Sequence, residues 1–117
     1  MSELRRIEIS EVGDVTVVRF RDRKILDAAS IQELGEELFA LIEQQDRKSL
    51  LLSFSNVEFL SSAALNKLII MDKKVKAFGG QLKFSDLKPE ILEVFVITRL
   101  TQLFEIKENE AEALAAF

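Results

Sequence analysis

The chain has 117 residues, 48% of them hydrophobic and 31% charged, a balance typical of a single globular domain that spans residues 1–117. Its formal net charge is -4, and 16 Lys and Arg residues are interspersed among 20 Asp and Glu residues, which argues against direct binding to nucleic acid or to an anionic membrane. The absence of both Cys and His excludes catalytic triads, Cys–His pairs and zinc sites of the usual kinds.

The sequence shows no sign of membrane insertion or export. No apolar run approaches the ~18 residues of a membrane-spanning helix. The first residues, Met1-Ser2-Glu3-Leu4-Arg5-Arg6, lack the apolar stretch of an export signal. Because the absence of Cys also fits a reducing compartment, we expect a cytoplasmic protein.

The first half of the chain predicts two strands, a helix and a further strand. Gly13 and Asp14 separate two alternating segments and predict a tight hairpin. Ser30 and Glu33 have the spacing of a capping box, so the helix is expected to begin at Ser30. An unbroken apolar run then predicts a central strand covered on both faces. The expected ranges are strands 7–10 and 15–20, helix 30–42 and strand 50–54.

The second half predicts helices alternating with strands. Gly79 ends an apolar stripe whose members, through Phe78, are expected to be core. Pro89 suits the first turn of a helix that reaches Ile97, also expected to be core. Asn109 begins a second capping-box spacing and predicts a terminal helix. The expected ranges are helix 65–78, strand 81–85, helix 89–97, strand 103–106 and helix 109–117.

The resulting order, β-β-α-β-α-β-α-β-α, predicts an α/β fold. Helices between the later strands imply right-handed crossovers and parallel pairing, while the first two strands form an antiparallel hairpin. We therefore predict a mixed sheet of four to five strands with about four helices.

The junction at residues 56–65 stands out because Ser61 and Ser62 lie between the buried strand and the second helix. One interpretation is a helix cap, which contributes about 1 kcal/mol. The other is a phosphorylation site, since phosphate on Ser62 would bring nearly two negative charges to the positive end of the helix dipole. The sequence contains no Gly-rich phosphate loop and no metal-binding pattern, so we expect no catalytic residue, no metal and no cofactor.

At this junction the chain resembles the STAS family of anti-sigma-factor antagonists. Leu60-Ser61-Ser62-Ala63-Ala64-Leu65 matches the family form hydrophobic-Ser-Ser-Ala-Gly-Leu, with Ala64 in place of Gly. In the other common form an Asp occupies the position of Ser61. Segments 26–30 and 100–106 also resemble the family, so the likeness extends from Ile7 to the C-terminus.

The resemblance implies a non-enzymatic switch in transcription control. Ser62 would be phosphorylated by an anti-sigma factor serine kinase, and the unphosphorylated form would bind this partner and free the sigma factor. Asp27, Ser61, Ala63 and Ala64 match the family's contact surface. The resemblance also allows a phosphorylation-independent STAS adaptor subunit of another signalling or transport complex, and small-molecule or nucleotide binding ranks third. We expect a monomer or weak dimer.

Overall fold

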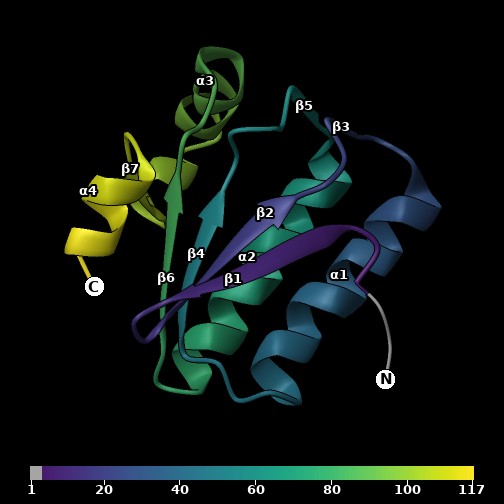
Figure 1. Cartoon of the computed structure of the whole chain (residues 1–117). Coiled ribbons are helices and arrows are strands. Elements are labelled where there is room, and N and C mark those ends of the chain that lie inside the picture. Colours follow the sequence, from purple (N-terminus) through teal and green to yellow (C-terminus); the bar gives the residue numbers. More distant parts are fainter. Residues whose placement is uncertain (1–3) are drawn as a thin grey trace.

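The computed structural model describes residues 4–117 and confirms an α/β fold with a mixed five-stranded sheet (Figure 1). β1 pairs antiparallel with β2, and all later strand pairs are parallel. In spatial order the strands are β1 (Ile7–Val12), β2 (Val15–Phe20), β4 (Ser49–Ser53), β6 (Gln81–Ser85) and β7 (Glu105–Lys107). The helices are α1 (Ala28–Glu43), α2 (Ser62–Ala77), α3 (Pro89–Ile97) and α4 (Glu110–Ala115), with a 3₁₀ turn, η1 (Leu100–Gln102), before β7.

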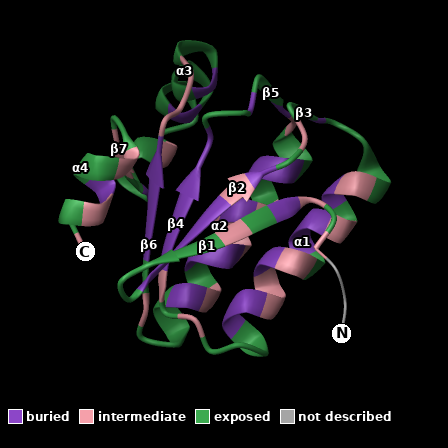
Figure 2. Cartoon of the chain, viewed as in Figure 1, coloured by how far each residue is buried: buried purple, intermediate pink, exposed green. Residues whose placement is uncertain are grey.

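The sheet separates two apolar clusters. Leu50 and Leu52 of β4 point into the larger cluster, which α1 and α2 cover. Leu51 points to the opposite face, where it packs with Val17 of β2 and Ala113 of α4. All three leucines are fully buried (Figure 2), which confirms the prediction of a central strand covered on both faces.

The first helix begins two residues earlier than predicted. Asp27 is its N-cap: the carboxylate accepts the Ser30 N–H at 2.9 Å and the Ser30 hydroxyl at 3.1 Å. Glu33, which was predicted to reach back to the backbone of Ser30, instead pairs with Arg6 at 2.8 Å. The prediction that Ser30 caps the helix was wrong. Asp27 lies three residues before Ser30, just as Ser30 lies three residues before Glu33, and Asp27 takes the capping position.

The two predictions of apolar core at Phe78 and Ile97 were also wrong. Ile97 is 72% exposed, because α3 turns Ile91 and Phe95 inward and leaves its other sides uncovered (Figure 2). Phe78 is 42% exposed, because it is the C-cap residue that follows the last turn of α2. The last strand begins two residues later than predicted, because the N–H groups of Leu103 and Phe104 still donate to the Leu100 carbonyl of the preceding 3₁₀ turn.

Two very short strands, β3 (Lys24–Ile25) and β5 (Phe59–Leu60), pair in parallel beside the main sheet. The carbonyl of Arg23 accepts the N–H of Phe59 at 3.1 Å, and the carbonyl of Ile25 accepts the N–H of Ser61 at 3.1 Å. These bonds tie the segment leading into α1 to the segment leading into α2. Sequence analysis predicted neither of these strands.

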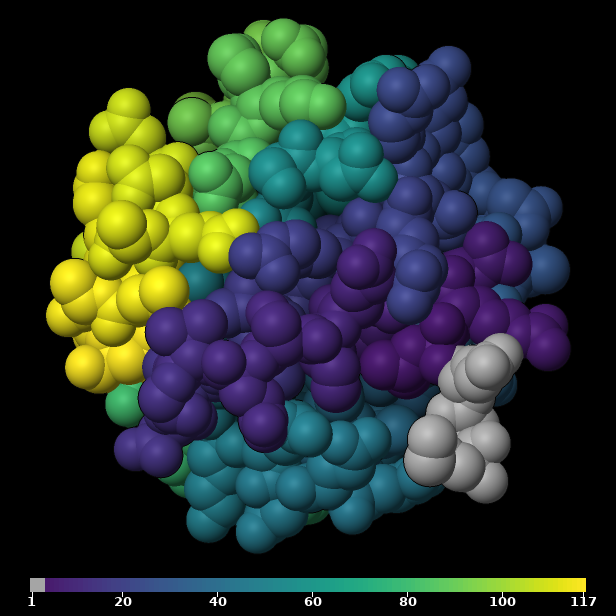
Figure 3. All heavy atoms as spheres, viewed as in Figure 1, coloured from purple at the N-terminus to yellow at the C-terminus, as the bar shows by residue number. Residues whose placement is uncertain are grey.

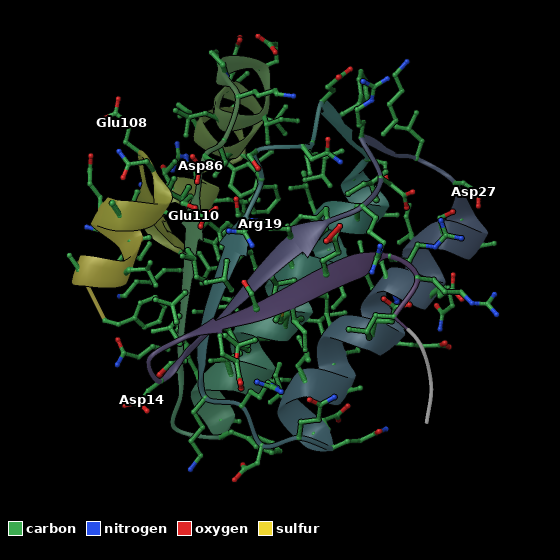
Figure 4. All side chains as sticks on the ribbon, viewed as in Figure 1. Asp14, Arg19, Asp27, Asp86, Glu108 and Glu110 are labelled. Carbon is green, nitrogen blue, oxygen red and sulfur yellow. The ribbon has the colours of Figure 1, made fainter. Side chains whose placement is uncertain are left out.

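The C-terminal helix lies on the face of the sheet opposite α1 and α2. Asn109 accepts the Glu112 N–H at 2.9 Å, which confirms the predicted helix start. Arg19 of β2 binds Glu110 at 2.7 Å and so fixes α4 to the sheet (Figure 4). α4 contributes Ala113 to the second apolar cluster.

Candidate functional site

The two serines at the junction between β5 and α2 have different structural roles. Ser61 is the N-cap of α2, and its hydroxyl oxygen accepts the Ala64 N–H at 3.2 Å. Ser62 is the first helical residue and is exposed. The capping interpretation therefore applies to Ser61, which leaves the Ser62 hydroxyl at the surface beside the positive end of the helix.

The N-termini of α1 and α2 meet at this end of the molecule. Parallel pairing sets Ile25 opposite Leu60, so that Asp27 and Ser62 each follow two residues after a paired position. The two helices then run in the same direction, with Lys67 of α2 donating to Gln32 of α1 at 3.4 Å. Two positive helix ends thus lie side by side, and an anion at this surface is favoured by both.

Asp27 has a structural role in this arrangement. The N–H and the hydroxyl of Ser30 both donate to its carboxylate, and these bonds lower the pKa of Asp27 from its ordinary value. The side chain remains exposed, so capping does not remove it from the predicted contact surface.

The other predicted contact residues divide into exposed and buried ones. Ala63 is exposed and Ser61 is half-buried at the surface. Ala64 is fully buried, because the third helical position of α2 faces the core. The expectation that Ala64 contributes a contact side chain is therefore corrected: its small size serves packing beneath the surface.

Two large apolar side chains near Ser62 were missed by sequence analysis. Phe59 is 56% exposed and Leu26 is 50% exposed, and they belong to the paired segments that lead into α2 and α1. A two-residue strand is too short to show alternation, so the sequence offered no sign that Phe59 points outward while Leu60 points inward. Apolar side chains next to an exposed hydroxyl form a surface suited to a protein partner.

Within residues 4–117, no group of three His, Cys, Asp or Glu side chains could hold a metal ion. None of the helices in the same range is long and apolar enough to cross a membrane.

Comparison with known proteins decides the family, because the model of the STAS domain matches residues 6–113. This chain belongs to the STAS family. The match includes the N-termini of α1 and α2 and the whole main sheet. The residues that first suggested the family thus lie within a domain that matches it nearly from end to end.

Several known proteins resemble this one. BtrV of Bordetella bronchiseptica, whose name assigns it to the anti-sigma factor antagonists, is 28% identical over 80% of this chain and 79% of its own. An anti-sigma-factor antagonist STAS domain protein of Planctomyces limnophilus superposes with a TM-score of 0.80, at 24% identity over 94% of this chain and 95% of that one. SpoIIAA of Bacillus in its phosphorylated form superposes with a TM-score of 0.70, at 17% identity over 94% and 97% of the two chains.

The capping role of Asp27 gives a pH-dependent prediction. Because its pKa is lowered in the folded state, the stability that Asp27 contributes is present above pH ~4 and is lost as the pH falls through the lowered pKa. Asp27→Asn keeps a capping oxygen but cannot titrate, whereas Asp27→Ala removes the cap. Urea unfolding at pH 7 should show Asp27→Asn close to the wild type and Asp27→Ala less stable.

The same two variants provide the control at acid pH. Below the folded-state pKa of Asp27 the advantage of the wild type over Asp27→Ala should shrink, while the difference between Asp27→Asn and Asp27→Ala should persist. Equal pH profiles for all three proteins would contradict a charged cap at Asp27.

Proposed function

We propose that this protein is an anti-sigma-factor antagonist whose docking to an anti-sigma factor serine kinase is controlled by phosphorylation of Ser62. The observation that carries the proposal is the exposed position of Ser62 as the first residue of α2. Its hydroxyl is free for modification because the neighbouring Ser61 supplies the cap. SpoIIAA, which has a similar fold and whose structure is known in the phosphorylated form, supports the proposal.

The unphosphorylated protein docks through the surface around Ser62. We assign to it the exposed Ala63 and Asp27 together with Leu26 and Phe59. The small side chain of Ala63 allows close approach of a partner backbone, and the two large apolar side chains supply area that a partner can bury. Ser61, half-buried at the rim, fixes the helix end on which these contacts depend.

Phosphorylation changes the partner contact and leaves the fold in place. A phosphoryl group on Ser62 lies next to the N–H groups that begin α2, which have no partner within the helix and favour an anion. The same group carries nearly two negative charges into a contact that must be stripped of water when the partner docks. The phosphorylated form therefore keeps its structure and releases its partner.

Ser61, which stands where other members of the family have Asp, is compatible with this mechanism. Both residue types cap helices through a side-chain oxygen, and Ser61 accepts the Ala64 N–H as a capping Asp would. The exchange removes one negative charge beside the acceptor hydroxyl, so a phosphate on Ser62 meets less repulsion than it would next to a carboxylate.

The test is to incubate the protein with the anti-sigma kinases encoded in its own genome and ATP, and to locate any phosphate by mass spectrometry. We expect one phosphate, on Ser62, and none in a Ser62→Ala variant. Ser55→Ala, which changes another exposed serine, is the matched control and should still be phosphorylated. If none of the kinases modifies Ser62 but one binds the protein, the phosphorylation-independent adaptor replaces the switch.

A further inference from the structure

The main sheet ends at β7, and the outer edge of this strand is unpaired in the part of the chain that the structure describes. The opposite edge strand, β1, is already covered at its start, because Glu37 of α1 accepts the N–H of Arg6 at 2.9 Å and of Ile7 at 3.2 Å. An unpaired edge is a template for a further strand. Among the described residues, β7 is unpaired on its outer side along all three of its residues.

The sequence of β7 is complementary to itself. When two copies pair antiparallel about Ile106, each Glu105 lies opposite the Lys107 of the other copy, so two opposite-charge pairs form. Both charged side chains point to the face that α4 covers and are partly exposed, at 47% for Glu105 and 35% for Lys107. The two are 3.6 Å apart within one chain, a weak contact that cross-strand pairing can replace.

The other face of β7 offers an apolar surface next to the same edge. A hollow of about 550 Å³ lies between β7, the 3₁₀ turn and the start of α3. It is lined mainly by apolar residues, namely Leu87, Pro89, Leu92, Phe104 and Ile106. Leu92 and Leu103 nearby are each 37% exposed. A strand added to β7 places its own Ile106 beside this hollow and covers part of it.

We propose that two copies of this chain associate through β7, in antiparallel register about Ile106, and so join two five-stranded sheets into one. The two-fold axis then passes through the sheet at the Ile106 pair, with the Glu105–Lys107 pairs on either side. Because only three residues pair, the dimer is weak, with a Kd on the order of 0.1–1 mM.

This dimer leaves the proposed docking surface free. β7 and α4 lie on one side of the molecule, and the paired segments β3 and β5 lie on the other (Figures 1 and 3). Each copy therefore displays its own Ser62, and a partner with two binding sites can engage both at once. The dimer does not depend on phosphorylation of Ser62, so it and the proposed function can fail independently.

The test measures the oligomeric state of the full chain. Sedimentation equilibrium from about 10 μM to 1 mM should show a monomer–dimer equilibrium. Amide NMR spectra over the same range should show shifts centred on β7 and the lining of the hollow. Lys107→Glu places like charges opposite each other twice, and it should weaken the dimer at least about tenfold. Lys48→Glu makes the same charge change at an exposed site away from β7 and should leave the dimer intact.

A charge exchange tests the register. Glu105→Lys alone should also be monomeric, whereas its mixture with Lys107→Glu restores opposite charges at both contacts and should give a heterodimer. Glu105 also binds Lys83 at 2.8 Å, so folding of Glu105→Lys is checked first by circular dichroism. If it does not fold, the comparison of Lys107→Glu with Lys48→Glu decides. A wild-type protein that stays monomeric at 1 mM, shifts centred away from β7, or equal behaviour of Lys107→Glu and Lys48→Glu would overturn the proposal.

Discussion

Ser62→Asp is expected to reduce binding of the anti-sigma factor partner by about a hundredfold or more while leaving the melting temperature within about 2 °C of the wild type. The loss of binding follows from a negative charge that must be desolvated in the contact, and a hundredfold corresponds to about 2.7 kcal/mol. The fold is unaffected because Ser62 is exposed and an acidic residue in the first turn of a helix is favoured. Calorimetric titration and thermal unfolding measure the two effects.

Ser62→Asn is the matched control for this experiment. Asn has nearly the size and shape of Asp but carries no charge, so it should bind within a few-fold of the wild type. If Ser62→Asn lost binding as completely as Ser62→Asp, the contact would depend on the shape of the serine rather than on charge. If Ser62→Asp unfolded the domain, Ser62 would be part of the core and the switch mechanism would be wrong.

The order of the main elements could be predicted from the sequence because each carries a strong local pattern. The run at Leu50–Leu52 is typical of a strand covered on both faces, and Gly79, with a φ of +75°, ends α2 where the sequence placed its end. Such patterns depend on the residues within one element. They do not require knowledge of what packs against it.

The errors arose where tertiary contacts override a local pattern. The capping box placed the start of the first helix at Ser30, but the helix begins after Asp27, where the pairing of Ile25 with Leu60 fixes the chain's entry into α1. Ile97 belongs to a helix that has apolar residues on several sides, but the fold covers only the side of Ile91 and Phe95. Neither outcome is encoded within the segment itself.

The position of the candidate site could be predicted from the sequence, but the separate roles of Ser61 and Ser62 could not. The family resemblance directed attention to both Ser61 and Ser62, and only the backbone path shows that Ser61 caps the helix. The exposure of Phe59 depends on the two-residue pairing with Lys24, which no sequence period reveals. The position of Ser62 at the start of a helix could be inferred from the sequence, whereas the exposed apolar side chains near it required the structure.

Phe54→Ala is expected to lower the free energy of unfolding by about 3–5 kcal/mol, a large share of the 5–15 kcal/mol typical of a domain. Phe54 is fully buried at the end of β4, and its ring lies 4.8 Å from that of Phe20, 5.2 Å from that of Phe84 and 6.2 Å from that of Phe95. Truncation leaves a cavity in the centre of these rings, which the surrounding elements cannot fill without moving the sheet. Urea unfolding, with the midpoint and slope fitted together, measures the loss.

Phe59→Ala makes the same substitution five residues later and separates packing from partner contact. Phe59 is 56% exposed, so its truncation should cost less than about 1 kcal/mol of stability but should weaken docking at the Ser62 surface. Phe54→Ala keeps the backbone carbonyl that accepts the Val57 N–H at 2.9 Å and removes a fully buried ring, so it affects docking only through the fold. Equal destabilisation by the two variants would mean that Phe59 is core, and the apolar part of the docking surface would have to be reassigned.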